Sequence, residues 1–282
     1  MATIGNKVLN ILVIGAHPDD CDFAAGGVAA LYSRLGHRVK FVSATNGCSG
    51  HHEIGGVELA LRRHGETRGV LNTLGLVDYE VLDNTDGELE PTLANRKRII
   101  RAIREFEPDL ILTHRPNDYH PDHRYTALLV QDAAYMVVVP NVLPLTTPLQ
   151  SNPVIAYVAD TFQKPYPFAP DVVVSIDEVI EQKVEALHCH TSQMYEWLPY
   201  VDHLDYHKGD VPSGESERKA WLARRYLPRF EDIANRYRGL LVKLYGPGRG
   251  NKVRYAEAFE GCEYGSRLTA DLIPVLLPFF GQ

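Results

Sequence analysis

Apolar residues in the first half of the chain alternate between short continuous runs and longer amphipathic stretches. The runs at 8–15, 38–44, 79–82 and 109–113 are typical of strands, and the stretches at 24–35, 55–74, 92–106 and 122–138 are typical of helices. Strands that are apolar throughout are buried on both faces, and strands alternating with helices form parallel sheets. The pattern therefore predicts an α/β fold, a Rossmann-like, mostly parallel sheet with helices on both faces and right-handed crossovers.

The second half of the chain is less regular. Strand candidates lie at 154–159 and 171–176, a helix is expected from its N-cap Asp177 to about His190, and loops are expected at 207–217 and 246–250. We therefore expect one domain over residues 1–200, with a C-terminal extension over residues 201–282 packed on the same domain. The apolar tail Leu268–Phe280 should pack against its own core or against a neighbouring subunit, because soluble proteins rarely expose such a patch.

Composition excludes several classes of protein. The net charge of −7 argues against nucleic acid as a partner, which would require a basic stripe. No window reaches the ~18 apolar residues of a membrane span, and the N-terminus lacks the pattern of a secretory signal. The 4 cysteines show no CxxC pairing and are typical of reduced thiols. These features predict a cytoplasmic protein.

Two short clusters of imidazole and carboxylate groups directly follow two of the predicted strands. They are Ala16-His17-Pro18-Asp19-Asp20 and His120-Pro121-Asp122-His123. The residues just past the carboxyl ends of parallel strands form the crevice where ligands bind. The two clusters can therefore converge on one point, and they predict a mononuclear metal site in a cleft.

Spacing within the clusters indicates which side chains bind the metal. His17 and Asp20 stand at i and i+3, which places them on one face of a helical turn, and His120 and His123 share this spacing. The minimal open site is His17, Asp20 and His123, because three protein ligands with a free position are typical of catalytic zinc. Asp19 is then a spare carboxylate and His120 a spare imidazole, the two extra groups that metal-assisted hydrolysis needs. Either motif alone could instead be an ordinary helix start.

The same motifs resemble those of the zinc-dependent LmbE-like, or PIG-L-type, N-acetylglucosaminyl deacetylases. The resemblance extends over most of residues 8–193. The weaker matches, in chain order, are Thr45-Asn46-Gly47, Arg63-x-x-Glu66, Asp86-Gly87, Pro116-Asn117 and His190-x-Ser192-Gln193. One departure is Cys48, which stands where many relatives have an acidic residue.

The resemblance implies a function and a role for each matching residue. The expected reaction is removal of an acetyl or other acyl group from an N-acetylglucosamine-type amino sugar or conjugate, and the protein could form a homo-oligomer. The implied roles are zinc binding by His17, Asp20 and His123, general-base catalysis by Asp19, oxyanion stabilisation or amine protonation by His120 with Asp122 holding its orientation, and contacts to sugar hydroxyls from Arg63 and Asp86.

Two alternatives use the same residues. Two histidines and one carboxylate also form the facial triad of non-haem iron oxygenases, so Fe²⁺ or another divalent metal could replace zinc. A non-catalytic sugar-binding member of the fold is the second alternative. Asp19 and His120 favour hydrolysis over both, because neither alternative needs a general base and a spare imidazole beside the metal.

Overall fold

A seven-stranded sheet forms the centre of the protein, with strand order β3-β2-β1-β4-β5-β7-β6. The computed structural model describes residues 7–204 and 209–281. Strands β1 to β5 pair in parallel, whereas β7 lies antiparallel between β5 and β6. The strands are β1 Asn10–Gly15, β2 Arg38–Ser43, β3 Asp78–Val81, β4 Leu110–Thr113, β5 Val154–Val158, β6 Val172–Ser175 and β7 Ala256–Gly261. The predicted α/β fold with a mostly parallel sheet is confirmed.

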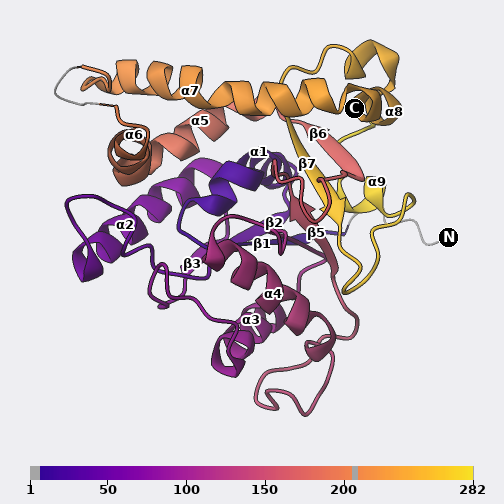
Figure 1. Ribbon diagram of the computed structural model, residues 1–282. Helices are drawn as coiled ribbons and strands as arrows, with labels where there is room; N and C mark the ends of the chain where they lie inside the picture. The colour runs from indigo at the N-terminus through magenta and orange to yellow at the C-terminus, as the bar shows by residue number, and fades with distance from the viewer. Residues whose placement is uncertain (1–6, 205–208, 282) are drawn as a thin grey trace.

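Helices cover both faces of the sheet (Figure 1). Leu12 and Ile14 of β1 pack into a core with α3 (Leu93–Phe106) and α4 (Pro121–Met136), whereas Ile11 and Val13 point into the core on the other face. That second face carries α1 (Asp20–Arg34), α2 (Gly56–Leu74), α5 (Ile180–Cys189) and α7 (Glu215–Arg236). The shorter or kinked helices are η1 Asp177–Val179, the π-helix η2 Ser192–Trp197, α6 Leu198–Val201, α8 Arg238–Gly250 and α9 Ile273–Leu276. Within the described ranges, no helix combines the length and apolar character needed to cross a bilayer.

Two expectations for the second half were wrong. Asp177 caps no helix, because its carboxylate accepts hydrogen bonds from the backbone N–H groups of Arg254 and Tyr255 at the entry to β7. The expected loop at 246–250 lies within α8, which kinks at Gly246 (φ 77°) and then continues. The expected loop at 207–217 is confirmed over residues 209–214, whereas helix α7 begins earlier than expected, at Glu215; residues 207–208 lie outside the described residues.

The apolar tail packs against its own core. Leu276, Leu277 and Phe279 are buried, the ring of Phe279 meets that of Tyr32 edge-on at 4.8 Å, and the Tyr32 hydroxyl donates to the carbonyl of Leu276. The prediction of packing on its own core is confirmed, and the homo-oligomer stays a prediction.

A buried ion pair joins the middle of α1 to the last strand. Lys183 on α5 and Glu257 on β7 are 0% and 1% exposed and contact each other. The Glu257 carboxylate accepts hydrogen bonds from the N–H groups of Gly27 and Val28, each at 2.8 Å, and Lys183 Nζ donates to carbonyl groups one turn earlier in α1. Gly27 is required here, because a Cβ would lie 2.9 Å from the Glu257 carboxylate and 2.5 Å from Ile176. Helix α1 is therefore fixed to β7 at the level of its glycine pair.

Candidate metal centre

The two His/Asp clusters lie side by side because β1 and β4 are neighbours in the sheet, with Ile14 opposite Thr113. Two residues after β1, His17 begins the turn that leads into α1, and Asp20 is the first residue of that helix. Its carboxylate accepts hydrogen bonds from the N–H groups of Ala16 (3.0 Å) and His17 (2.8 Å), which fix it in the turn. The structure thus brings together side chains that are far apart in the sequence.

The three predicted ligands lie within contact distance of one another, Asp20 through both of its carboxylate oxygens. His17 Nδ1 lies 3.2 Å from Asp20 Oδ2, His123 Nε2 lies 3.4 Å from Asp20 Oδ1, and the two ring nitrogens are 3.3 Å apart. Ligands bound at 2.0–2.1 Å in a tetrahedral zinc site are about 3.3 Å from one another. The donor set therefore fits a divalent metal.

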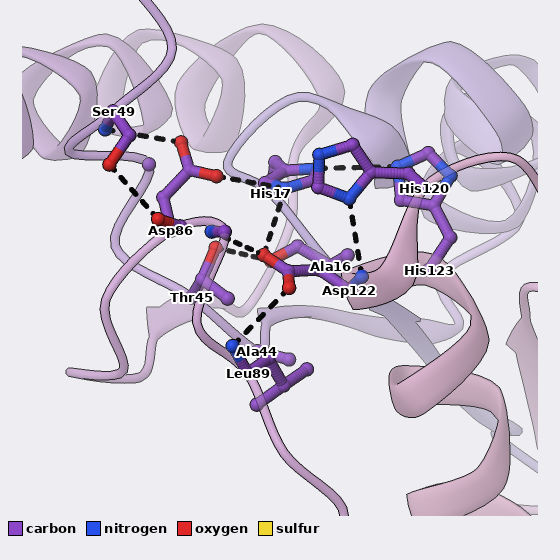
Figure 2. A network of polar contacts seen from close by, with 12 residues as sticks. Ala16, His17, Ala44, Thr45, Ser49, Asp86, Leu89, His120, Asp122 and His123 are labelled. Atoms are coloured by element: carbon purple, nitrogen blue, oxygen red, sulfur yellow. Dashed lines mark hydrogen bonds and ion pairs between the residues drawn. The ribbon is translucent and has the colours of Figure 1, made fainter.

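The outward-facing nitrogens of the two ligand histidines contact carboxylates, and Figure 2 shows those on His17. His17 Nε2 lies 3.2 Å from Asp86 Oδ1 and 3.4 Å from Asp122 Oδ2, and His123 Nδ1 lies 3.1 Å from Asp118 Oδ2. Such contacts are typical of metal-binding histidines, because a carboxylate on the far nitrogen fixes the tautomer and the ring orientation. This arrangement leaves the inner nitrogens free to bind a metal.

His120 begins helix α4 and contacts Asp122 through the backbone. The N–H of Asp122 donates to His120 Nδ1 at 3.2 Å, whereas the Asp122 carboxylate accepts from the N–H groups of Gly87 and Leu89 and faces His17. The orienting contact on His120 is thus a main-chain hydrogen bond. Because Nδ1 is an acceptor, neutral His120 carries its proton on Nε2.

The ionisable side chains of this cluster shift the pKa values of one another. Burial acts to raise the pKa of Asp20, Asp86, Asp118 and Asp122, but the nearby imidazoles and hydrogen bonds outweigh it, so the pKa of each carboxyl is lowered. Burial, together with the neighbouring His17 and His123, lowers the pKa of His120. Ionised carboxylates around a neutral imidazole favour binding of a cation.

Asp19 stands beside the ligands with one cationic partner. Its Oδ1 lies 2.9 Å from Arg63 Nη2, and the Arg63 side chain also donates to the carbonyl of Gly47 at 3.3 Å. Gly47 has φ 69° and permits this close approach, because a Cβ there would lie 2.6 Å from the guanidinium. Arg63 is only 1% exposed, so it is not part of a solvated helix face. Cys48, the departure from the family pattern, is a buried free thiol.

Two residues of the cluster, Asp118 and His114, were missed by sequence reasoning. His114 is the first residue after β4, and its Nε2 lies 3.3 Å from Asp20 Oδ2 and accepts the N–H of Ala16 at 3.2 Å. Its ring stacks on His123 with centroids 4.2 Å apart. Three groups in the described residues have ligand atoms close enough to share a metal ion: Asp20, His114 and His123; His17, His120 and His123; and His17, Asp86 and Asp122. The signal for His114 was its position at the carboxyl end of a strand, the same signal that marked the two motifs.

A cavity of about 770 Å³ opens over these groups. The predicted site residues that line it are His17, Asp19, Asp20, Arg63, Asp86, His120 and His123, whereas Asp122 lies behind His17. Its other wall comes from late segments of the chain and includes Trp197, Asp202, Tyr226 and Arg229, none of which stands out in the sequence. His190 does not line the cavity and instead contacts Asp22 in the core at 3.0 Å.

Comparison with known proteins places this arrangement in a family. The model of the family described as PIG-L, GlcNAc-PI de-N-acetylase, matches residues 12–134. The diacetylchitobiose deacetylase of Thermococcus kodakarensis is 31% identical over 73% of this chain and 80% of its own length.

Solved structures share the fold. The N,N′-diacetylchitobiose deacetylase of Pyrococcus horikoshii aligns with TM-score 0.68 and 25% identity over 91% of this chain and 84% of its own. The 4-carboxy-2-hydroxymuconate hydratase GalB of Pseudomonas putida aligns with TM-score 0.69 and 20% identity over 93% and 98%, so the fold also occurs in a hydratase. With 31% identity to a deacetylase across most of both chains, and with both motifs converging on one cavity, this chain belongs to the PIG-L, or LmbE-like, family.

Proposed function

We propose that this protein is a metal-dependent amide hydrolase that removes the acetyl group from an N-acetylglucosamine-type amino sugar or from a conjugate of one. The observation that carries the proposal is the pairing of Asp19 and His120 with the three predicted ligands in one cavity. Similarity to a diacetylchitobiose deacetylase supports the substrate class. The hydratase is less similar to this chain in sequence than the deacetylase is.

His17, Asp20 and His123 would hold the metal, and zinc is the ion we propose. Fe²⁺ fits the same donors, since two histidines and one carboxylate suit either ion. When bound, the ion would supply acidification of water and polarisation of the amide carbonyl.

Asp19 is the general base in this mechanism. Its carboxylate lines the cavity beside Asp20 and would accept the proton of the attacking water. The ion pair with Arg63 holds the carboxylate in place before the substrate binds.

His120 faces the other side of the reacting amide. Its Nε2–H can donate a hydrogen bond to the carbonyl oxygen as negative charge develops there, because Nδ1 is occupied by the N–H of Asp122. The leaving amine needs a proton, which either His120 or the protonated Asp19 can supply.

Arg63 and Asp86, which the resemblance assigned to sugar hydroxyls, both line the cavity. Each also contacts a group that takes part in the chemistry, Arg63 with Asp19 at 2.9 Å and Asp86 with His17 at 3.2 Å. We therefore propose that they position these groups as well as contacting the sugar. Their substitution should affect kcat as well as KM.

We further propose a cytoplasmic location. All four cysteines, Cys21, Cys48, Cys189 and Cys262, are free thiols, which is typical of a reducing compartment.

A substrate screen tests the proposed function. The full chain, reconstituted with Zn²⁺ or Fe²⁺, is incubated with N-acetylglucosamine, N,N′-diacetylchitobiose and charged N-acetylglucosamine derivatives, and released acetate and primary amine are measured. The His123→Ala variant, treated identically, is the matched control. We expect equal amounts of acetate and amine from at least one substrate with wild-type protein only. Fully metal-loaded protein that releases neither product from any of them would contradict the proposal.

A further inference from the structure

Each carboxylate and each arginine that lines the cavity contacts a side chain of opposite charge, with one exception. Six carboxylates line it, and each contacts a basic side chain. Four are site carboxylates described above, and the other two are Asp160, which forms a two-pronged ion pair with Arg115, and Asp202, which pairs with Arg225. No lining carboxylate is therefore left to hold a cationic substituent.

Arg229 on α7 is the exception. The other two arginines that line the cavity, Arg63 and Arg115, are each bound to a carboxylate. Within residues 7–204 and 209–281, the guanidinium of Arg229 makes no hydrogen bond and no ion pair, and the residue is exposed to solvent. The carboxylates of Asp160 and Asp118 attract it only through space, because each is engaged by another base.

Packing fixes the position of this arginine at the wall of the cavity. Its guanidinium lies over the ring of Phe23 on α1, 5.1 Å from the centroid, and that ring meets Tyr226, one turn earlier on α7, edge-on at 5.2 Å. All three residues line the cavity. The contacts leave the edge of the guanidinium, which carries its N–H donors, without a protein partner.

We propose that Arg229 is a specificity-determining residue that binds an anionic group, a carboxylate or a phosphate, on the substituent attached to the amino sugar. A guanidinium presents paired donors that match the two oxygens of either group. The metal centre and Asp19 would then act on the acetamide, while Arg229 on α7 binds the charged substituent of the same substrate. This inference rests on the proposed function and names the substrate class of the same site.

Matched pairs of substrates test the specificity. One pair is the carboxymethyl glycoside of N-acetylglucosamine and its methyl ester, and the other is N-acetylglucosamine 1-phosphate and the methyl glycoside, so the two pairs distinguish carboxylate from phosphate. We expect Arg229→Gln to lower the ratio of kcat/KM for anionic over neutral substrate by about 10- to 100-fold for at least one pair, mainly through KM. Arg229→Lys should retain part of the preference, because it keeps the charge without the paired donors.

Arg224→Gln is the matched control, since Arg224 is an exposed arginine on the same helix that does not line the cavity. It should leave the ratio within about twofold of wild type. Equal ratios in Arg229→Gln and Arg224→Gln for both pairs overturn the proposal. Thermal unfolding of each variant confirms that the comparison is between folded proteins.

A binding measurement separates this inference from the proposed function. Calorimetric titration of glucosamine 1-phosphate and carboxymethyl glucosaminide, against glucosamine itself, requires no turnover. Tighter binding of an anionic ligand by wild type, lost in Arg229→Gln, supports the subsite even if no acetamide is hydrolysed. Equal affinity of wild type for the anionic and neutral ligands rejects the subsite even if the enzyme deacetylates.

Discussion

The two walls of the cavity are built on different principles. On the wall formed after β1 and β4, each predicted ligand contacts a second ligand, and each ligand imidazole also contacts a carboxylate. On the wall formed by η2, α6 and α7, the rings of Trp197 and Tyr226 line the cavity together with Arg229, whose guanidinium has no polar partner in the described residues. The side chains of the first wall hold one another in place, whereas Arg229 on the second wall is available to bind a group of the substrate. We therefore propose that chemistry and selectivity reside in separate parts of one chain.

The largest effect should come from removing a ligand on the first wall. His17→Ala, Asp20→Ala and His123→Ala should each lose the bound metal and all measurable turnover together, because two remaining ligands hold the ion too weakly. Elemental analysis and acetate release are the measurements. His64→Ala, which removes an exposed histidine of α2, is the control and should keep both. Full metal occupancy in all three ligand variants would refute the assignment.

Asp19→Asn separates chemistry from metal binding. The amide cannot accept a proton from water, so kcat should fall by about 10²- to 10⁴-fold. Metal content should remain that of wild type, because Asp19 contacts Arg63 and is not one of the three proposed ligands. A variant with near-normal kcat would show that another group is the base.

Glu257→Gln tests how strongly β7 stabilises helix α1, which carries Asp20 of the first wall. Losing one charge of a buried pair leaves Lys183 uncompensated, which typically costs about 3–5 kcal/mol of unfolding free energy. Urea denaturation measures the loss. Glu263→Gln, at an exposed position just after β7, is the control and should be close to wild type. Equal stability of the two variants would mean that the pair contributes little to joining α1 and β7.

The smallest effect is expected for the carboxylate behind His123. Asp118→Asn keeps a hydrogen-bonding side chain at 3.1 Å from His123 Nδ1 but removes the charge. Metal affinity should fall about 10- to 100-fold, as for other carboxylates that orient a ligand histidine. Competition with a chelator of known affinity measures it. An unchanged affinity would assign the orientation of the ring to its stacking on His114.

Predictability from the sequence differed between the two walls for a physical reason. The family and the α/β fold are confirmed because β1, β4 and the helices between them follow regular apolar patterns, and both motifs directly follow strands. Helix α1 starts at Asp20, earlier than its apolar pattern suggests, because its first turn carries polar site residues. The roles of the site residues stay predictions.

The second half of the chain was harder to predict, because its determinants are not periodic. Strand β7, with the sequence AEAFEG, contains two glutamates, and Glu257 becomes acceptable in a buried strand through Lys183 and the N–H groups of α1, all far away in the sequence. Arg229 is one of several arginines in α7, and only the three-dimensional structure shows that it reaches the cavity. Pairings between distant charges leave no local pattern.

The buried pair of Lys183 and Glu257 also limits how this protein can be recombined. The carboxylate that anchors the middle of α1 lies in the C-terminal extension, whereas its lysine lies before residue 200. Exchanging the extension with that of a relative, in order to graft a different α7 and a different selectivity, would leave Lys183 without its counter-charge unless the relative supplies a glutamate at the same place in β7. Under the proposed role of Arg229, substrate range and the anchoring of helix α1 are inherited together, and a working chimera must carry both members of the pair.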